Sequence, residues 1–313
     1  MRVPTTTYTD AFVGELNTLR SRQSALQNRA TTGLRVSSAS DDPAAMQNAL
    51  SLMADKSTAQ QHGANVTALQ DRTTQIYNVL QSLQKISSQA GELAVAVTNV
   101  LTPEAKSPLI KQLNGLIEQA LSAANTKDSL TGAGIFGGTS GSAAPFTATY
   151  DSSGNVTAVS YAGNDAVNSV EIGQGATVSV DVPGANTSGS GARGVFTDSR
   201  SGADFFANLI KLRDDIVAGN SAAIPTTDAA ALQKDSDNII FHVGSLGAQQ
   251  TRLDLAATTL QNRMSALDKN ISDATSADLV QTIVQLNQAQ NSYQAALQSG
   301  SKIMQLSILN YIQ

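Results

Sequence analysis

The sequence predicts a mainly α fold with a β-rich insertion. Long helices from both ends of the chain are expected to pack antiparallel as a helical bundle or coiled coil, with a small β domain at the tip. Two observations support this. Of 23 glycines, 14 lie between Thr131 and Gly202, and on either side of them apolar residues follow helical spacing. Because glycine disfavours helix, the middle of the chain is expected to form strands and turns.

The N-terminal segment carries one apolar helical stripe. Gln23 fills its single gap, and its other members are Phe12, Leu16, Leu19, Leu26 and Ala30. Gly33 can end this helix. The following "SSASDDP" can start the next one, with Asp42 as the N-cap and Pro43 at the first helical position.

The next segment keeps a 3-4-3-4 spacing without slipping, which predicts a helix packed lengthwise on another helix. Its ten positions are Val66, Leu69, Thr73, Ile76, Leu80, Leu83, Ser87, Ala90, Ala94 and Val97. A further helix is expected to begin at Thr102 and Pro103 and to end near Asn125.

The middle segment has the alternation typical of strands. In "APFTATYDSSGNVTAVSYAG" a turn-rich "DSSGN" separates two alternating runs, which predicts a β-hairpin. Further alternation follows at Val170, Ile172, Val178, Val180 and Val182. We interpret residues 137–199 as a β-rich insertion between the helical flanks.

Helical spacing returns after residue 200. Ser201 stands three residues before Asp204, as in a capping box. A long stripe then follows at Leu246, Leu253, Ala257, Leu260, Met264, Leu267, Ile271 and Ala274, with Gln250 in the remaining slot. The register shifts at "ISDATSADL", where Thr275 and Asp278 could cap a fresh helix.

The final 35 residues, 279–313, contain one charged side chain, Lys302. An exposed helix usually carries charges on its wet face, so this composition indicates burial against neighbouring copies of the chain. An ordinary two-helix coiled coil with a low-charge end is the simpler alternative. The predicted subunit or chaperone interface is Phe12, Leu16, Leu19, Leu26, Leu279, Ile283, Leu286, Tyr293, Leu297, Met304 and Leu309.

Composition excludes several classes of function. The net charge is −5 without a basic block, so no nucleic-acid partner is expected. The absence of cysteine excludes disulfides, zinc–thiolate sites and thiol catalysis. No run approaches the roughly 18 apolar residues that a membrane span needs, so no membrane insertion is expected. The start "MRVPTTTYTDAFVGEL" lacks the apolar core of a cleaved signal peptide.

Few residues could support chemistry. Capping explains Asp42 of the Asp41–Asp42 pair better than catalysis does, because adjacent residues at a helix start do not face one substrate. The histidines, His62 and His242, each fall near a helical stripe without a clustered partner. We therefore expect no catalytic residue, no cofactor and no metal.

The connection between the first two predicted helices carries a family resemblance. "TTGLRVSSASDDPAAM" resembles the N-terminal signature of the flagellin superfamily, and its Asp-Asp-Pro form is similar to the hook-associated protein 3 family. "MRVPTTTY", "YAGNDAVNSVEIGQGATVSVDVPG" and "LSILNYIQ" resemble the same family. "DATSADL" departs from it by lacking an Asp-Ala-Asp run, and Gln313 extends past the expected apolar end.

The resemblance implies a structural protein of the hook–filament junction, exported unfolded by the flagellar type III pathway with an uncleaved signal and located outside the cell. Residues 1–42 and 275–313 would form an inner polymerisation domain, residues 43–136 and 200–274 a helical bundle, and residues 137–199 an outward insertion. The implied partners are copies of the chain in a ring, the adjoining hook-associated protein, flagellin and an export chaperone. The filament flagellin, a secreted coiled-coil effector or adhesin, and, least favoured, an enzyme remain alternatives.

Overall fold

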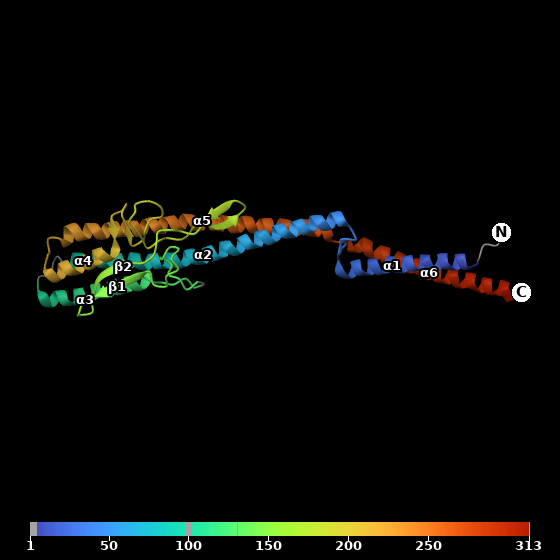
Figure 1. The fold of residues 1–313 in the computed structure, drawn as a ribbon, viewed down its shortest axis with the longest axis horizontal. Helices are drawn as coiled ribbons and strands as arrows, with labels where there is room; N and C mark the ends of the chain where they lie inside the picture. Colours follow the sequence, from blue (N-terminus) through green and yellow to red (C-terminus); the bar gives the residue numbers. More distant parts are fainter. Residues whose placement is uncertain (1–4, 98–101, 130, 313) are drawn as a thin grey trace. The chain divides into compact units, whose positions relative to one another are not determined.

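The structure, a computed structural model, describes residues 5–97, 102–129 and 131–312 (Figure 1); for residues 5–9, 103 and 303–312 it describes the backbone alone. The chain divides into two compact units. The terminal unit comprises Met1–Thr58 and Asn262–Gln313, and the middle unit is Ala59–Gln261. Each unit is described by itself.

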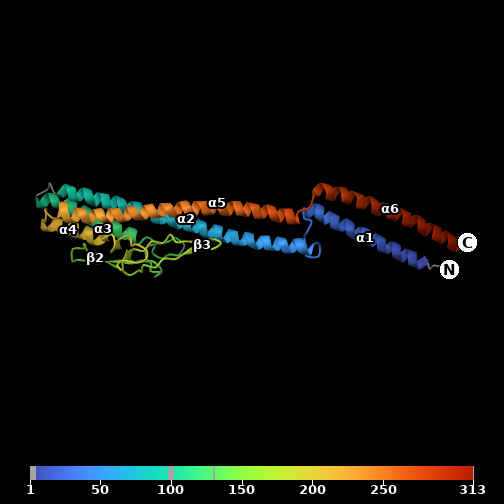
Figure 2. The same ribbon diagram turned by 90° about the horizontal axis from the view of Figure 1, so that it is seen from above.

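The terminal unit is helical. It contains α1 (Thr5–Thr32), the first turns of α2 (Pro43–Val97), the last turns of α5 (Ala229–Thr275) and α6 (Leu279–Ile312). Helices α1 and α6 pack antiparallel along their length (Figures 1 and 2). The pairing of the two ends of the chain that the sequence predicts is confirmed.

The middle unit is a bundle formed by the rest of α2 and α5 with two shorter helices, α3 (Pro103–Ala124) and α4 (Phe205–Ala218). A π-helix of five residues, η1 (Ile224–Asp228), precedes α5. All ten positions of the predicted stripe on α2 are buried, so that prediction is confirmed. The bounds of α3 also agree with the prediction, since the helix begins at Pro103 and ends one residue before Asn125.

Among the described residues after α3, seven short strands form three small sheets. Strands β1 (Phe146–Tyr150) and β2 (Val156–Tyr161) form the predicted hairpin, with an irregularity between Thr149 and Tyr150. A second antiparallel pair is β3 (Val170–Gly173) with β4 (Ala176–Val178). The third sheet has the order β5 (Ala185–Asn186), β6 (Thr197–Asp198) and β7 (Ala203–Asp204), with β5 parallel and β7 antiparallel to β6.

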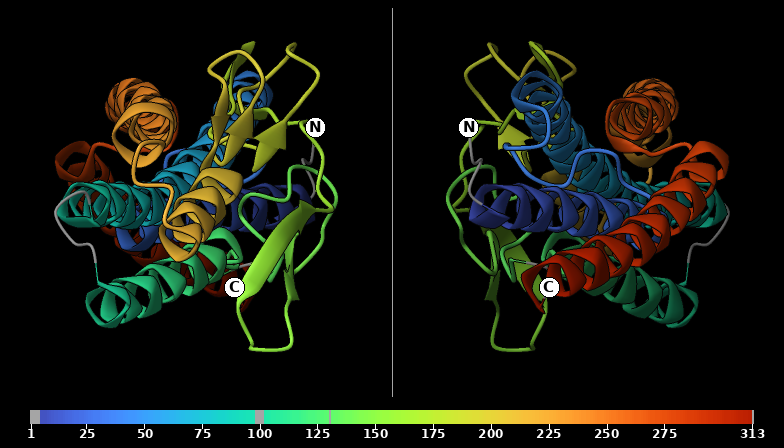
Figure 3. Two further views of the ribbon diagram at one scale, coloured as in Figure 1. Left: turned by 90° about the vertical axis from the view of Figure 1, so that its left-hand side faces the viewer. Right: turned by 90° about the vertical axis from the view of Figure 1, so that its right-hand side faces the viewer.

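The sheets lie along the sides of the helices of the middle unit, not at their tip as predicted (Figure 3, left). The β1–β2 hairpin packs on α3 and α4. On the second hairpin, the carbonyl of Glu171 accepts from Asn65 Nδ2 of α2 at 2.8 Å, and that of Thr177 accepts from Arg252 of α5 at 3.2 Å. The physical reason is that strands of two to six residues cannot bury a core of their own and share one with the helices.

Aromatic rings build this shared core. Five of the seven phenylalanines form one cluster, with neighbouring ring centroids 4.8–6.2 Å apart: Phe136, Phe146, Phe196, Phe205 and Phe206. The cluster joins the loop after α3, the strands and the start of α4, so it ties the insertion to the bundle.

The start of α4 differs from the prediction. Asp204 is the N-cap, and its Oδ1 accepts from the backbone N–H of Ala207 at 3.4 Å. Ser201 makes no capping box, because its hydroxyl donates to the carbonyl of Asp198 at 3.2 Å. At α6, Asp278 is the cap, accepting from the N–H of Gln281 at 3.1 Å, while the hydroxyl of Thr275 donates back to Ile271 within α5.

We predict that Phe196→Ala destabilises the middle unit by about 3–5 kcal/mol, because Phe196 is fully buried and contacts the other four rings of the cluster. Denaturant unfolding followed by circular dichroism measures the change. Phe241→Ala is the matched control, since Phe241 is an exposed ring of α5; it is expected to cost less than about 1 kcal/mol. Equal losses in the two variants would contradict the shared aromatic core.

Candidate assembly surface

The predicted stripe on α1 faces α6 within the same chain. Phe12, Leu16 and Leu19 are half-buried and Leu26 is buried. On α6, the residues turned toward α1 include Leu286, Ala289, Tyr293 and Gly300. We call this contact the α1–α6 seam.

One position in the seam requires glycine. A Cβ atom built on Gly300 would lie 2.2 Å from Cζ of Phe12, much closer than real side chains approach. The Phe12 ring therefore packs directly on the α6 backbone. Small residues at this seam let the two helices lie close together, which increases the number of dispersion contacts between them.

The predicted α6 stripe divides into two faces. Leu286 and Tyr293 belong to the seam, whereas Leu279, Ile283 and Leu297 are exposed. Met304 and Leu309 lie outside the residues whose side chains are described. The interface predicted from the sequence is thus partly an internal contact and partly a free surface.

Valines missed by the sequence interpretation complete the free surface. Val280, Ile283 and Val284 are 75%, 50% and 51% exposed and form what we call the outer α6 patch. In "DLVQTIVQL" apolar residues stand next to each other, which gives a helix two apolar faces instead of one; this signal was readable in the sequence. On α2, Leu50 and Met53 are also exposed.

The connections that follow α1 and α5 are joined by backbone hydrogen bonds. The N–H of Arg35 donates to the carbonyl of Thr275 at 2.7 Å, and the N–H of Ala277 donates to the carbonyl of Gly33 at 2.8 Å. Leu34 and Ser276 form an isolated antiparallel bridge between these bonds. Gly33 has φ of 72°, a left-handed conformation that suits glycine where α1 ends. We call this arrangement the connector clasp.

Charged side chains reinforce the connector clasp. Arg35 pairs with Asp42 at 3.0 Å and donates to the carbonyl of Ala274 at 3.0 Å. Asp42 also accepts from the N–H of Ala45 at 3.0 Å, in the N-cap position before Pro43. This backbone hydrogen bond, followed by the bond from Arg35, lowers the pKa of Asp42.

Asp41 organises the turn before α2. Its Oδ2 accepts from the N–H groups of Ser37 and Ser38, at 3.0 and 2.9 Å, and from the Ser37 hydroxyl at 3.0 Å. These bonds, the one from the Ser37 backbone first, lower the pKa of Asp41 to about 2. The carboxylates of Asp41 and Asp42 thus accept from backbone N–H groups, from the Ser37 hydroxyl and from Arg35.

The histidines are not brought together with a catalytic partner. His242 is buried, and its Nε2 lies 3.2 Å from the carbonyl of Gly194; burial lowers its pKa to about 4. His62 is half-buried on α2. Within the described ranges, no group of three or more histidine, aspartate and glutamate residues could hold a metal ion, and no helix is long and apolar enough to span a bilayer.

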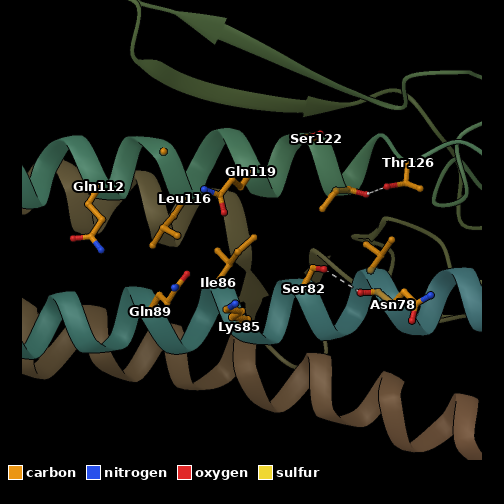
Figure 4. A pocket seen from close by; sticks show the side chains of 13 residues that line it. Asn78, Ser82, Lys85, Ile86, Gln89, Gln112, Leu116, Gln119, Ser122 and Thr126 are labelled. Atoms are coloured by element: carbon orange, nitrogen blue, oxygen red, sulfur yellow. Dashed lines mark hydrogen bonds between the residues drawn. The ribbon is translucent and has the colours of Figure 1, made fainter.

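A surface groove of about 790 Å³ runs between α2 and α3 (Figure 4). Its rim consists of amides and hydroxyls, including Asn78, Gln89, Gln112 and Gln119, and Lys85 supplies its one charge. Leu116 contributes to the apolar floor. The groove lacks the paired base and nucleophile that covalent or acid–base catalysis needs.

Comparison with known proteins gives two kinds of match. Residues 11–140 match the bacterial flagellin N-terminal helical region. No curated protein matches the chain significantly in sequence. Among solved structures, a protein assigned as a flagellar hook-associated protein of Vibrio parahaemolyticus superposes with a TM-score of 0.65 at 21% identity, covering 75% of this chain and 100% of that one.

Two further solved structures show the same fold. FlgL of Xanthomonas campestris gives a TM-score of 0.55 at 19% identity, over 71% of this chain and 98% of that one. FlgL of Bacillus cereus gives a TM-score of 0.52 at 19% identity, over 74% of this chain and 100% of that one. The chain is therefore flagellin-like in its N-terminal region and has the fold of flagellar hook-associated proteins.

We predict that Gly300→Val loosens the α1–α6 seam by about 1–3 kcal/mol, because the new side chain would overlap the Phe12 ring. Hydrogen exchange of α1 and α6 amides measures the loss of protection. Gly14→Ala is the control: its added Cβ meets nothing within 4 Å, so it should raise helix stability slightly. Unchanged exchange in Gly300→Val would show that the seam does not form as described.

The low pKa of Asp41 predicts that the connection between α1 and α2 is sensitive to acid. Because its pKa in the folded chain, about 2, lies below the ordinary value of 3.8, its stabilising effect is complete above about pH 4 and is lost as the pH falls toward 2. Amides of residues 37–41 should therefore exchange faster, after correction for intrinsic rates, at pH 2.5 than at pH 5. In Asp41→Asn this difference should be smaller; an identical difference would assign the acid sensitivity to another group.

Proposed function

We propose that this chain is a structural component of the bacterial flagellum at the hook–filament junction, where it links hook to filament through its terminal helices and has no catalytic activity. The observation that carries the proposal is the terminal unit. It pairs α1 with α6, yet it leaves the outer α6 patch uncovered on a helix with a single charged residue, Lys302. The hook-associated fold supports placing this unit in the flagellum.

The outer α6 patch suits contact with another subunit. Its three branched side chains are half or more exposed, and burying each contributes on the order of 1 kcal/mol. β-branched residues also lose little side-chain entropy when they become ordered. Repeated in every subunit of a ring, such contacts would stabilise an assembly without charged pairs.

The proposed partners are copies of the chain in a ring, the adjoining hook-associated protein, flagellin and an export chaperone. We place the assembled protein outside the cell, after export without a cleaved signal peptide. The division into an inner domain (1–42 and 275–313), a bundle (43–136 and 200–274) and an outward insertion (137–199) remains a prediction. So does the assignment of Phe12, Leu16, Leu19 and Leu26 to subunit contacts, since these side chains also form the α1–α6 seam.

Deletion of the gene tests the junction role directly, with electron microscopy of the cells and detection of flagellin in the medium as readouts. Hooks without filaments, with flagellin secreted and lost, would support the proposal. Loss of the major filament protein would identify the chain as the flagellin instead. Intact, motile flagella in a strain with one copy of the gene would favour a secreted coiled-coil effector or adhesin.

We predict that Ile283→Asp reduces swimming and assembly at least tenfold without altering the thermal unfolding of the monomer, because Ile283 lies on the outer α6 patch and not in the seam. Soft-agar motility and electron microscopy measure the effect. Leu286→Asp is less suitable, since Leu286 is half-buried against α1.

Ile283→Leu is the matched control for this experiment. It keeps the apolar surface and should swim nearly as well as the wild type. Normal swimming by Ile283→Asp would exclude the outer α6 patch as a subunit contact.

A further inference from the structure

One face of α5 holds a long irregular segment of the chain in place. Asp235, Asn238 and His242 stand at positions i, i+3 and i+7 of the helix, so they share one face. All three are buried against residues 185–204, which contain strands β5, β6 and β7. We call residues 185–204 the docked segment.

Each of these three side chains bonds to the docked segment or its immediate continuation. Asp235 accepts from the N–H of Asp204 at 2.9 Å and from Asn208 Nδ2 of α4 at 2.8 Å. Asn238 Nδ2 donates to the carbonyls of Gly194 and Val195 at 2.9 and 2.8 Å. His242 Nε2 lies 3.2 Å from the same Gly194 carbonyl, so the neutral ring donates there through Nε2–H.

Asp235 is a buried acid without a basic partner. It is 1% exposed, and both of its oxygens accept from neutral N–H groups. The charged group that faces it across the contact is another acid, Asp204, and neither carboxylate forms an ion pair among the described residues. The neighbouring Lys234 approaches Gly202 instead. Burial, with Asp204 adding to it, raises the pKa of Asp235 to about 7.

His242 is a buried base in the opposite situation. It is 4% exposed, and the charged groups that face it are Asp198, Arg193 and Arg200. Asp198 is already paired with Arg200 at 2.7 Å, so it offers the ring little compensation. Burial lowers the pKa of His242 to about 4, and the two arginines act in the same direction.

We propose that Asp235 and His242 form an opposed pair, in which the pH dependence of one group acts against that of the other, so that opening of the docked segment from α5 changes less between pH 5 and pH 8 than either group alone would make it change. This inference does not depend on the proposed function. It explains why two ionisable groups of opposite type share one buried face of a helix, seven residues apart, without contacting each other.

The pKa of each group sets the direction in which pH changes the docking of the segment. The stabilising effect of neutral Asp235 is complete below its ordinary value of 3.8 and is lost as the pH rises through about 7. The stabilising effect of neutral His242 is complete above its ordinary value of 6.5 and is lost as the pH falls through about 4. From pH 5 to pH 8, Asp235 alone would favour opening of the docked segment roughly 80-fold, and His242 alone would disfavour it roughly 30-fold.

A thiol reporter measures the opening. The chain has no cysteine, so Val195→Cys places a single thiol in the docked segment at a buried position. The rate of labelling by a pyridyl disulfide, divided by the rate for the same chain in denaturant at the same pH, gives the opening constant. Measurements at pH 5, 6, 7 and 8 are made in four backgrounds: wild type, Asp235→Asn, His242→Gln and the double variant.

The four backgrounds have distinct expected results. The opening constant of the wild type changes less from pH 5 to pH 8 than that of either single variant. It falls roughly 30-fold in Asp235→Asn and rises roughly 80-fold in His242→Gln. In the double variant it changes only through the remaining groups, chiefly Asp204, whose pKa is also raised by burial. Asn and Gln keep hydrogen-bonding groups at these positions but do not titrate. Asp237→Asn, an exposed change on the same helix, should behave as the wild type.

Either single variant can overturn the proposal. A flat profile in Asp235→Asn, or in His242→Gln, would show that the substituted group does not titrate against docking. If one variant fails to fold, the other decides alone. Denaturant unfolding of the four chains without the cysteine, between pH 5 and pH 8, gives an independent reading that must show the same opposite slopes.

Discussion

Every long helix of this chain depends on the lengthwise burial of one apolar stripe against a partner. On α2 the stripe runs through ten successive positions, and even its two hydroxyl residues are buried. Thr73 tolerates burial because its hydroxyl donates to the carbonyl of Leu69 in its own helix at 2.7 Å. Exposed ion pairs each contribute little, so packing along these stripes is a main source of stability for the helices that the structure describes.

On α6 this burial is incomplete. The α1–α6 seam uses one face of α6 and leaves a second apolar face in water. A single partner helix can cover only one side of another helix, so the second face needs a further contact. The proposed structural role, in which the subunit completes its packing in an assembly, is consistent with this surface.

The sequence predicted the helices well because their signal is local and repeats many times. The heptad of α2, the start of that helix after Asp42 and the hairpin around "DSSGN" could all be read from spacing alone. The position of the sheets could not, because it depends on five phenylalanines that are far apart in the sequence and meet only in the folded chain.

Other misses have equally specific causes. Ser201 and Asp204 both fit the start of α4, and the choice was decided by Asp198, which engages Ser201 instead. Leu286 and Ile283 fit one approximate stripe, but which of them meets α1 depends on the rotation of α6. The buried face of Asp235, Asn238 and His242 gives no sequence signal, since polar residues on a helix ordinarily face water.

The connector clasp has a mechanical consequence. Its backbone hydrogen bonds join the connection after α1 to the connection after α5. Tension applied to either terminal helix would therefore be divided between these two connections. Arg35 adds a third link through Ala274 and Asp42. Under tension, two cross-linked connections are expected to yield at a higher force than two independent ones, because several hydrogen bonds must rupture together. In the proposed junction, the clasp would share load between the two terminal helices.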